Sequence, residues 1–132
     1  MISPVEGESG RLVRRLLKVL SHLSWPAGQQ RAYLAELGVA PSLDELALEF
    51  DDALKPLLAL YGDIGINEEA QRMLASIDAL FAAMGRHPGD PDSVWEWQAL
   101  DSDSRWAKIR RMAGSVSAQL QNGMSGKAGD VE

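Results

Sequence analysis

The chain has 132 residues, of which 45% are hydrophobic and 24% are charged, and it contains no cysteine. This length suits one domain that buries a core without cross-links. The absence of cysteine excludes disulfide bonds and thiolate metal sites. No apolar run approaches the roughly 18 residues that a membrane span needs, and no signal-peptide pattern opens the chain. We therefore expect a cytoplasmic protein that does not insert into membranes.

The net charge of −6 is unevenly distributed along the chain. Residues 1–35 hold five Lys/Arg and two Glu, residues 36–103 hold 15 Asp/Glu and three Lys/Arg, and residues 104–132 hold five Lys/Arg and two acids. An acidic middle argues against nucleic acid as the main ligand, because phosphate contacts need clustered Lys and Arg. The sequence leaves open whether the basic ends fold back over the acidic middle.

Residues 1–10 contain two glycines and a proline without periodicity, so we expect a flexible lead. Apolar residues at helical spacing then run from Leu12 to Leu23 and predict a helix. The cations of this stretch and His22 fall on the opposite side. That basic side fits a membrane surface or a nucleic acid, but we favour a side that is solvated or docked on the acidic helix.

A second helix is predicted after Ser24. This serine is placed to act as its N-cap, and Pro26 fits the first turn, where a missing N–H costs nothing. Gly38 stands where a left-handed C-terminal cap belongs, and Pro41 prevents continuation.

Residues 42–61 predict the central helix of the domain. Ser42 and Glu45 have the S-x-x-E spacing of a capping box. Pro56 removes one backbone donor, so the helix must either bend there or end and restart, and we favour a bend. Its predicted apolar stripe consists of Leu43, Leu46, Ala47, Phe50, Leu54, Leu57, Leu58 and Tyr61.

The second half of the chain continues the helical pattern. Asn67 is the predicted cap of an amphipathic helix that ends at Gly85. A Pro/Gly loop over residues 86–91 precedes a short piece over 94–100 that we expect to close the end of the bundle. The last helix starts near residues 101–103, and residues 123–132 are predicted to be disordered.

No segment alternates with a period of two, so no sheet is predicted. We predict an all-α single domain over residues 11–122, an irregular bundle of about five helices. Its predicted core contains Leu16, Leu20, Leu34, Leu46, Phe50, Leu54, Leu74, Ile77, Phe81, Ile109, Ala113 and Val116.

Catalytic patterns are missing from the sequence. His22 and His87 are the only imidazoles, and neither has a second histidine at metal-ligand spacing. There is no G-x-S-x-G, no glycine-rich phosphate loop before a helix and no cysteine nucleophile. We therefore expect a protein that is not an enzyme and needs no cofactor.

Carboxylates are dense enough to suggest one metal-dependent alternative. Glu45, Glu49 and Asp52 lie on successive turns, and all-helical nucleotide pyrophosphohydrolases hold Mg²⁺ with acids at such spacings. Arg72 stands where the second acidic pair of that pattern would need an acid. A solvated acidic face is the favoured interpretation, and a Mg²⁺-dependent phosphohydrolase remains an alternative.

Protein binding fits these carboxylates better. Complementary charge speeds encounter with a basic partner, while a few aromatic residues supply most of the affinity. The predicted partner-binding residues are Asp44, Glu45, Glu49, Asp51, Asp52, Glu36, Trp95 and Trp97.

A block of this chain resembles small bacterial helical proteins. It comprises Trp25, Gln30, Tyr33-Leu34, Leu37-Gly38, Pro41-Ser42 and the run Asp44 to Asp52, with looser similarity through residue 113. Some of those proteins resemble the immunity partners encoded beside secreted polymorphic toxins. The resemblance implies an inhibitor that occupies the surface of a basic toxin or effector, and a homodimeric structural module remains an alternative.

Overall fold

The computed structural model describes residues 8–39, 43–60, 66–84, 95 and 97–129, with backbone only for residues 8, 9 and 123–129. This part of the chain is helical and contains no strand, which confirms the predicted all-α class. Its helices are α1 (Glu8–Ser24), α2 (Ala27–Leu37), α3 (Asp44–Leu58), α5 (Glu68–Ala83), the short α6 (Ala99–Ser102) and α7 (Ser104–Gly129).

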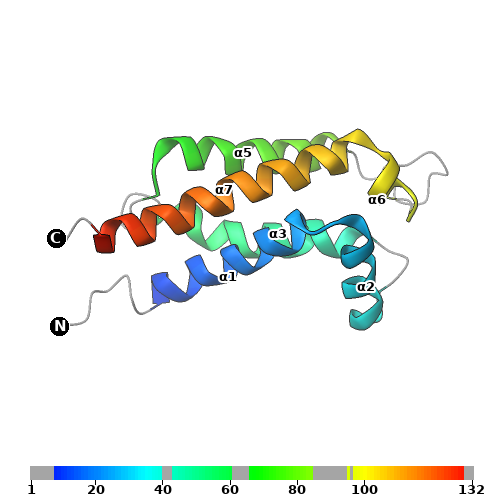
Figure 1. Cartoon of the computed structure of the whole chain (residues 1–132), viewed down its shortest axis with the longest axis horizontal. Coiled ribbons are helices and arrows are strands. Elements are labelled where there is room, and N and C mark those ends of the chain that lie inside the picture. Colours follow the sequence, from blue (N-terminus) through cyan, green and yellow to red (C-terminus); the bar gives the residue numbers. More distant parts are fainter. Residues whose placement is uncertain (1–7, 40–42, 61–65, 85–94, 96, 130–132) are drawn as a thin grey trace.

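The four long helices form a bundle in which α1 packs against both α3 and α7, and α7 packs against α5 (Figure 1). The helices α1 and α7 run in opposite directions, so that α1 begins where α7 ends, at one end of the bundle. At the opposite end α2 crosses the bundle and contacts α6. The short α6 and Trp95 therefore lie at an end of the bundle, as predicted for the segment over residues 94–100.

The core lies among all four long helices. Every residue of the predicted core is buried, because the apolar positions follow the 3.6-residue period of the helices. An aromatic cluster fills one end: the Trp106 ring, which is fully buried, lies 5.8 Å from Phe81 and 5.7 Å from Trp95 between centroids. Phe50 joins it at 5.8 Å from Phe81.

Two predicted helix caps are confirmed and one is wrong. The Asn67 side chain accepts a hydrogen bond from the Ala70 N–H at 2.8 Å, and Gly38 has the left-handed φ of 78°. Ser24 does not cap α2: it is the last residue of α1, and its hydroxyl donates to the Ser21 carbonyl at 2.9 Å. Pro26 occupies the N-cap position instead, because α2 starts directly after it.

The central helix passes through Pro56 without restarting and ends at Leu58. Its predicted apolar stripe was one residue too wide. Leu57 is buried but Leu58 is 53% exposed, because the step of about 100° from one residue to the next carries Leu58 off the buried side of this helix. Ser42, Tyr61 and the loop with His87 lie outside the described residues.

The helices extend past both limits predicted for the helical domain, residues 11–122, because α1 begins at Glu8 and α7 ends at Gly129. The division into a lead, a domain and a tail stays a prediction. Among the described residues, no helix is both long and apolar enough to cross a membrane.

Candidate functional site: the groove between α3 and α5

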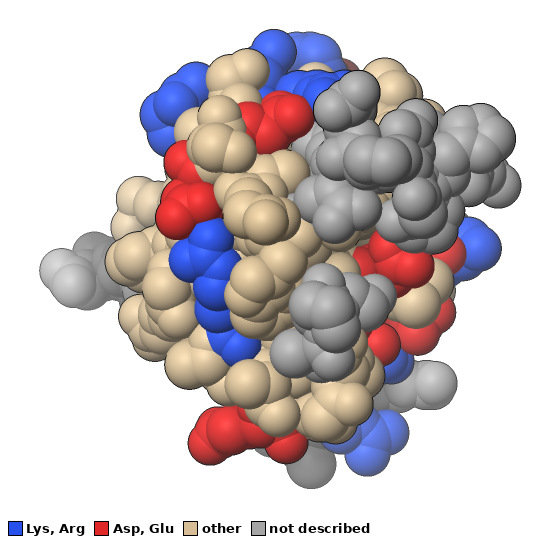
Figure 2. Space-filling model, turned by 90° about the vertical axis from the view of Figure 1, so that its right-hand side faces the viewer, with Lys and Arg blue, Asp and Glu red and all other residues tan. Residues whose placement is uncertain are grey.

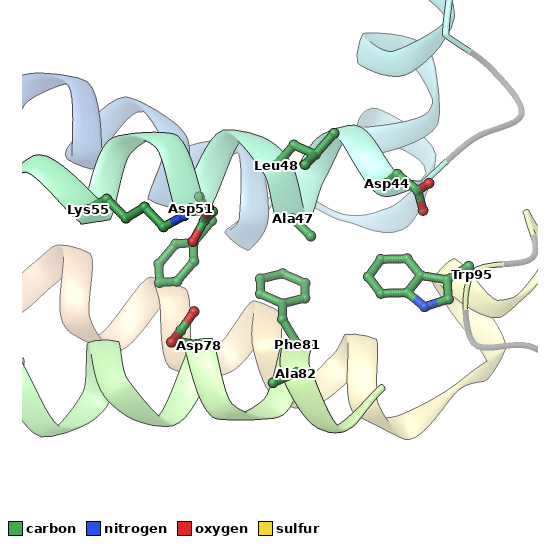
Figure 3. Close-up of a pocket in the computed structure, with 10 residues that line it drawn as sticks. Asp44, Ala47, Leu48, Asp51, Lys55, Asp78, Phe81, Ala82 and Trp95 are labelled. Atoms are coloured by element: carbon green, nitrogen blue, oxygen red, sulfur yellow. Dashed lines mark ion pairs between the residues drawn. The ribbon is translucent and has the colours of Figure 1, made fainter. Parts of the chain in front are cut away.

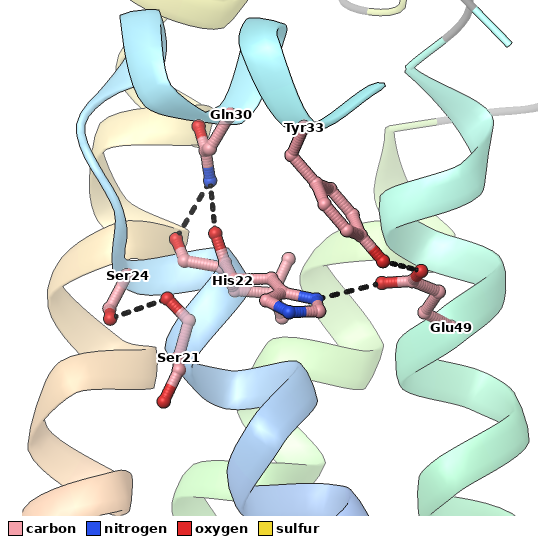
Figure 4. Close-up of polar contacts among 7 residues, drawn as sticks. Ser21, His22, Ser24, Gln30, Tyr33 and Glu49 are labelled. Atoms are coloured by element: carbon pink, nitrogen blue, oxygen red, sulfur yellow. Dashed lines mark hydrogen bonds and ion pairs between the residues drawn. The ribbon is translucent and has the colours of Figure 1, made fainter. Parts of the chain in front are cut away.

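Glu49, predicted to belong to an exposed acidic face, points toward α1 and α2 instead. Its carboxylate lies 3.2 Å from Nδ1 of His22 and accepts a hydrogen bond from the Tyr33 hydroxyl (Figure 4). Both contacts connect residues far apart in sequence, and they join three helices at one carboxylate. Glu49 therefore has a structural role, and its assignment as a partner contact stays a prediction.

His22 belongs to the basic side of its helix, and it lies against the acidic helix α3 rather than in solvent. Only 7% of it is exposed, and its ring lies 4.3 Å from the Tyr33 ring and 4.6 Å from the Trp25 ring. A histidine tolerates this position because Glu49 satisfies one ring nitrogen. Burial, and then the hydrogen bond to Glu49, raises the pKa of Tyr33 above its ordinary value, and the nearby Glu45 adds to that shift.

Gln30 fixes α2 on the end of the bundle. It is fully buried, and its amide nitrogen donates to the His22 and Leu23 carbonyls, both at 3.0 Å. Those are carbonyls near the end of α1, which lack partners within a helix. The Nε of Arg110 donates to the Gln30 oxygen at 3.3 Å, so this one side chain also reaches α7.

Trp97, a predicted anchor for a partner, is half-buried at the same end. The guanidinium carbon of Arg31 lies 5.8 Å from its ring centroid, which is a cation–π contact. Arg31 also pairs with Asp101 at 2.8 Å. Trp97 therefore contributes to the α2–α6 contact.

On the other flank of α3, an elongated groove separates α3 from α5 (Figure 3). Its volume is about 550 Å³. Ala47 lines it from α3 and Ala82 from α5, the Phe81 ring lies between the two helices, and Trp95 lies toward one end. The groove exists because α3 and α5 meet through side chains such as Phe50 and Phe81, whereas the pairs α1–α3, α1–α7 and α5–α7 pack closely along their backbones.

Carboxylates surround this groove. Asp44 and Asp51 line it from α3, and Asp78 lines it from α5. Among the described residues that line it, Lys55 is the cation, and its Nζ lies 3.0 Å from Asp51. The hydrogen bond from Lys55 to Asp51 raises the pKa of Lys55, and the negative charges of Asp52 and Asp78 also raise it. The described lining of the groove therefore combines apolar side chains with three carboxylates and one ammonium group.

The predicted partner-binding residues are divided by the fold. Asp44, Asp51 and Trp95 come together at the groove. The others lie elsewhere: Glu45 and Glu49 toward Tyr33, Asp52 exposed on α3, Glu36 exposed on α2, and Trp97 beside Arg31. Figure 2, which shows the α2–α6 end, likewise has Asp and Glu in separate groups rather than one continuous patch.

Asp78 and Leu48 also line the groove but were not predicted as contact residues from the sequence. A signal for Leu48 is present: Asp44, Leu48, Asp51 and Lys55 follow a four-three-four spacing, which places them on one stripe of α3. Leu48 is 55% exposed on this stripe. No local signal marks Asp78, because its proximity to Lys55 depends on how α5 is placed.

The described cations of α1 do not line the groove. Arg11, Arg14, Arg15 and Lys18 are exposed on α1, which packs against α3 away from the groove. Within the described residues, His22 and Glu49 form the ionic contact between α1 and α3. The acidic groove is therefore not neutralised by the cations of α1.

The carboxylates behind the Mg²⁺ alternative do not converge. Glu49 is engaged by His22 and Tyr33, and within the described ranges no group of three or more His, Cys, Asp or Glu is arranged to hold a metal ion. No observation on this fold favours a phosphohydrolase over a binding protein.

Comparison with known proteins adds no assignment: no family model, no curated protein and no solved structure matches the chain. The resemblance to immunity-type proteins stays a prediction from the sequence.

Proposed function

We propose that this protein is a non-enzymatic, cytoplasmic binding module of the immunity type, which inhibits a basic toxin or effector by occupying its surface. The observation that carries the proposal is the groove between α3 and α5, with apolar walls and three carboxylates around it. The partner class is the one expected from the acidic middle of the sequence. The proposed contact surface is smaller than the acidic face expected from the sequence, because the Glu49 carboxylate is bonded to His22 and Tyr33.

The composition of the groove supports protein binding. Apolar side chains surrounded by charge are the usual composition of a protein contact surface, in which the apolar centre supplies affinity and the charges supply rate and selectivity. Leu48 offers an exposed apolar side chain, and Asp51 and Asp78 supply negative charge on opposite walls.

The experiment is affinity capture of the tagged protein from its native cell at low and high salt, followed by mass spectrometry. Asp78→Lys reverses a charge in the groove. Glu69→Lys makes the same charge change nine residues earlier on α5, about two and a half turns away and therefore on the opposite flank. We expect the wild type and Glu69→Lys to retain one basic protein at low salt, and Asp78→Lys to lose it.

High salt should release the partner from the wild type, because steering by exposed charges is screened. A capture that gives no basic protein, or one that both charge reversals weaken equally, would argue against the groove as the inhibitory surface. Inhibition is then tested directly, by adding the protein to the captured partner and measuring the loss of the partner's toxicity.

A further inference from the structure

We infer that the side of the bundle formed by α1 and α7 docks on an anionic lipid bilayer, where the protein adsorbs through charge and without insertion. We call this side the basic face. It consists of the exposed cations Arg11, Arg14, Arg15 and Lys18 on α1 and Lys108 and Arg111 on α7. A contact through this face is independent of the α3–α5 groove, which carries the proposed function.

The register of α1 places its four cations on the solvent side. They recur at steps of three and four from Arg11 to Lys18, which is the spacing of one helix face. The opposite side of the helix is buried in the core through Leu16 and Leu20. None of the four cations forms an ion pair with another described residue. Their charge is therefore available to an anion outside the protein.

The neighbouring helix α7 extends the basic face. Lys108 and Arg111 are exposed one turn apart, and neither is ion-paired within the described part of the chain. The sequence of α7 contains no Asp or Glu, and that of α1 contains none after Glu8. Because α1 and α7 pack side by side, their solvent sides adjoin (Figure 1). Cations thus gather on these two helices without carboxylates between them.

The other layer of the bundle carries the opposite charge. Five carboxylates on α3 and three on α5 stand against Lys55 and Arg72. Since α1 packs on α3 and α7 packs on α5, the axes of the two layers are about 8–10 Å apart, and their solvent sides are further apart still. That separation is at least about one Debye length at physiological ionic strength. The net charge of −6 therefore permits adsorption and turns the α3–α5 groove away from the bilayer.

The spacing of the cations favours a bilayer over a nucleic acid. Gly114 of α7 lies against Ser24 of α1, where an added Cβ would be 3.8 Å from the serine Cβ. In this antiparallel register Arg111 and Lys18 are about 14 Å apart along the bundle axis. Anionic lipids diffuse and can collect under both groups of cations, whereas phosphates along a nucleic-acid strand have a fixed spacing.

The basic face also lacks the rings on which bases stack. Trp106 is the only Phe, Tyr or Trp in the sequences of α1 and α7, and it is fully buried. Proteins that bind single strands combine cations with exposed aromatic side chains. The apolar side of α1 is already used in the core, and within the described residues no helix could span a membrane. Adsorption through charge alone therefore fits this face.

The experiment is sedimentation of the full chain with vesicles of phosphatidylcholine mixed with phosphatidylserine, and with vesicles of phosphatidylcholine alone. Each Lys or Arg near an anionic bilayer strengthens binding about fivefold, so six of them contribute a factor on the order of 10⁴. We expect binding to the mixed vesicles at low ionic strength and release at high salt. Absence of that binding, equal binding to the neutral vesicles, or binding that persists at high salt would each overturn the inference.

Three variants with the same charge change locate the contact. Arg14→Glu and Arg111→Glu each reverse one charge on the basic face, and Arg72→Glu reverses one on α5, where the arginine side chain is 73% exposed. The first two should weaken vesicle binding by about twenty-fivefold, and Arg72→Glu by less than about twofold. Circular dichroism checks that each variant is folded. Equal losses in all three would assign binding to net charge and overturn the inference.

Labelled duplex DNA and RNA are the competing ligands. We expect the wild type to bind the mixed vesicles in preference to either nucleic acid at equal concentrations of anionic groups. A nucleic acid that binds more tightly than the vesicles, with an affinity that Arg14→Glu lowers, would assign the basic face to nucleic acid and overturn the inference.

Discussion

The Nδ1 atom of His22 lies 3.2 Å from a carboxylate oxygen of Glu49, across 27 residues of sequence. With the Tyr33 hydroxyl on the other oxygen, this pair joins α1, α2 and α3 at one partly buried point. Because this carboxylate accepts hydrogen bonds from two buried or half-buried donors, it stabilises the fold. Replacing it should therefore lower the stability of the protein.

Glu49→Ala should lower the free energy of unfolding by about 2 kcal/mol, because it leaves the Tyr33 hydroxyl and a His22 ring nitrogen without an acceptor. The measurement is urea unfolding followed by tryptophan fluorescence. Asp52→Ala on the exposed side of the same helix is the matched control and should change stability by less than about 0.5 kcal/mol. Equal effects of the two variants would contradict the role given to Glu49.

The raised pKa of Tyr33 makes stability depend on alkaline pH. In the unfolded chain this phenol ionises near pH 10, whereas in the folded state it keeps its proton to higher pH. Its contribution to stability is therefore complete below about pH 10 and falls as pH rises above that value, because only the unfolded state releases the proton.

Tyr33→Phe removes this titration. The difference in unfolding free energy between wild type and Tyr33→Phe should shrink as the pH is raised from about 9 to about 11. Parallel pH dependences in the two proteins would show that Tyr33 ionises equally in both states.

Gln30→Leu keeps the side-chain size but removes the amide that contacts the His22 and Leu23 carbonyls and Arg110. We expect a loss of about 3 kcal/mol, since the Leu23 carbonyl and the Arg110 Nε each lose a hydrogen bond and the His22 carbonyl keeps only the one from the Trp25 N–H. Gln29→Leu, at the adjacent exposed position, is the control and should be nearly neutral. Hydrogen exchange provides a second reading: amides of α2 should exchange faster in Gln30→Leu than in Gln29→Leu.

Trp106→Ala should destabilise the protein by about 4 kcal/mol, because it opens a cavity beside Phe81 and Trp95 at a fully buried position. Trp97→Ala removes a half-buried ring and should cost clearly less. Thermal unfolding of the three proteins side by side checks the order, and a reversal of that order would contradict the described core.

Periodicity was sufficient to predict the fold class and the core. Leu46, Phe50 and Leu54 are buried because they recur at the spacing of one helix face, and that spacing is visible in the sequence. The cap at Asn67 was also predictable, since the residue type and its position before an amphipathic run are both local.

The candidate site was predicted only in part, because it depends on which flank of α3 meets which neighbour. Asp51 and Glu49 are two residues apart and looked equivalent, yet one faces α5 and the other faces α1 and α2. Similarly, His22 belongs to a basic stripe by sequence and to the interior by packing. Such assignments require the relative placement of helices, which a pattern within one helix does not contain.

The antiparallel pairing of α1 and α7 has a practical consequence for experiments on this protein. The start of α1 and the end of α7 lie at the same end of the bundle. A linker attached at either of these two helix ends therefore leaves the molecule on the same side. If the protein is attached to a solid support through the start of α1 or through the end of α7, α2, α6 and the Trp95 end of the groove face away from the support in both cases.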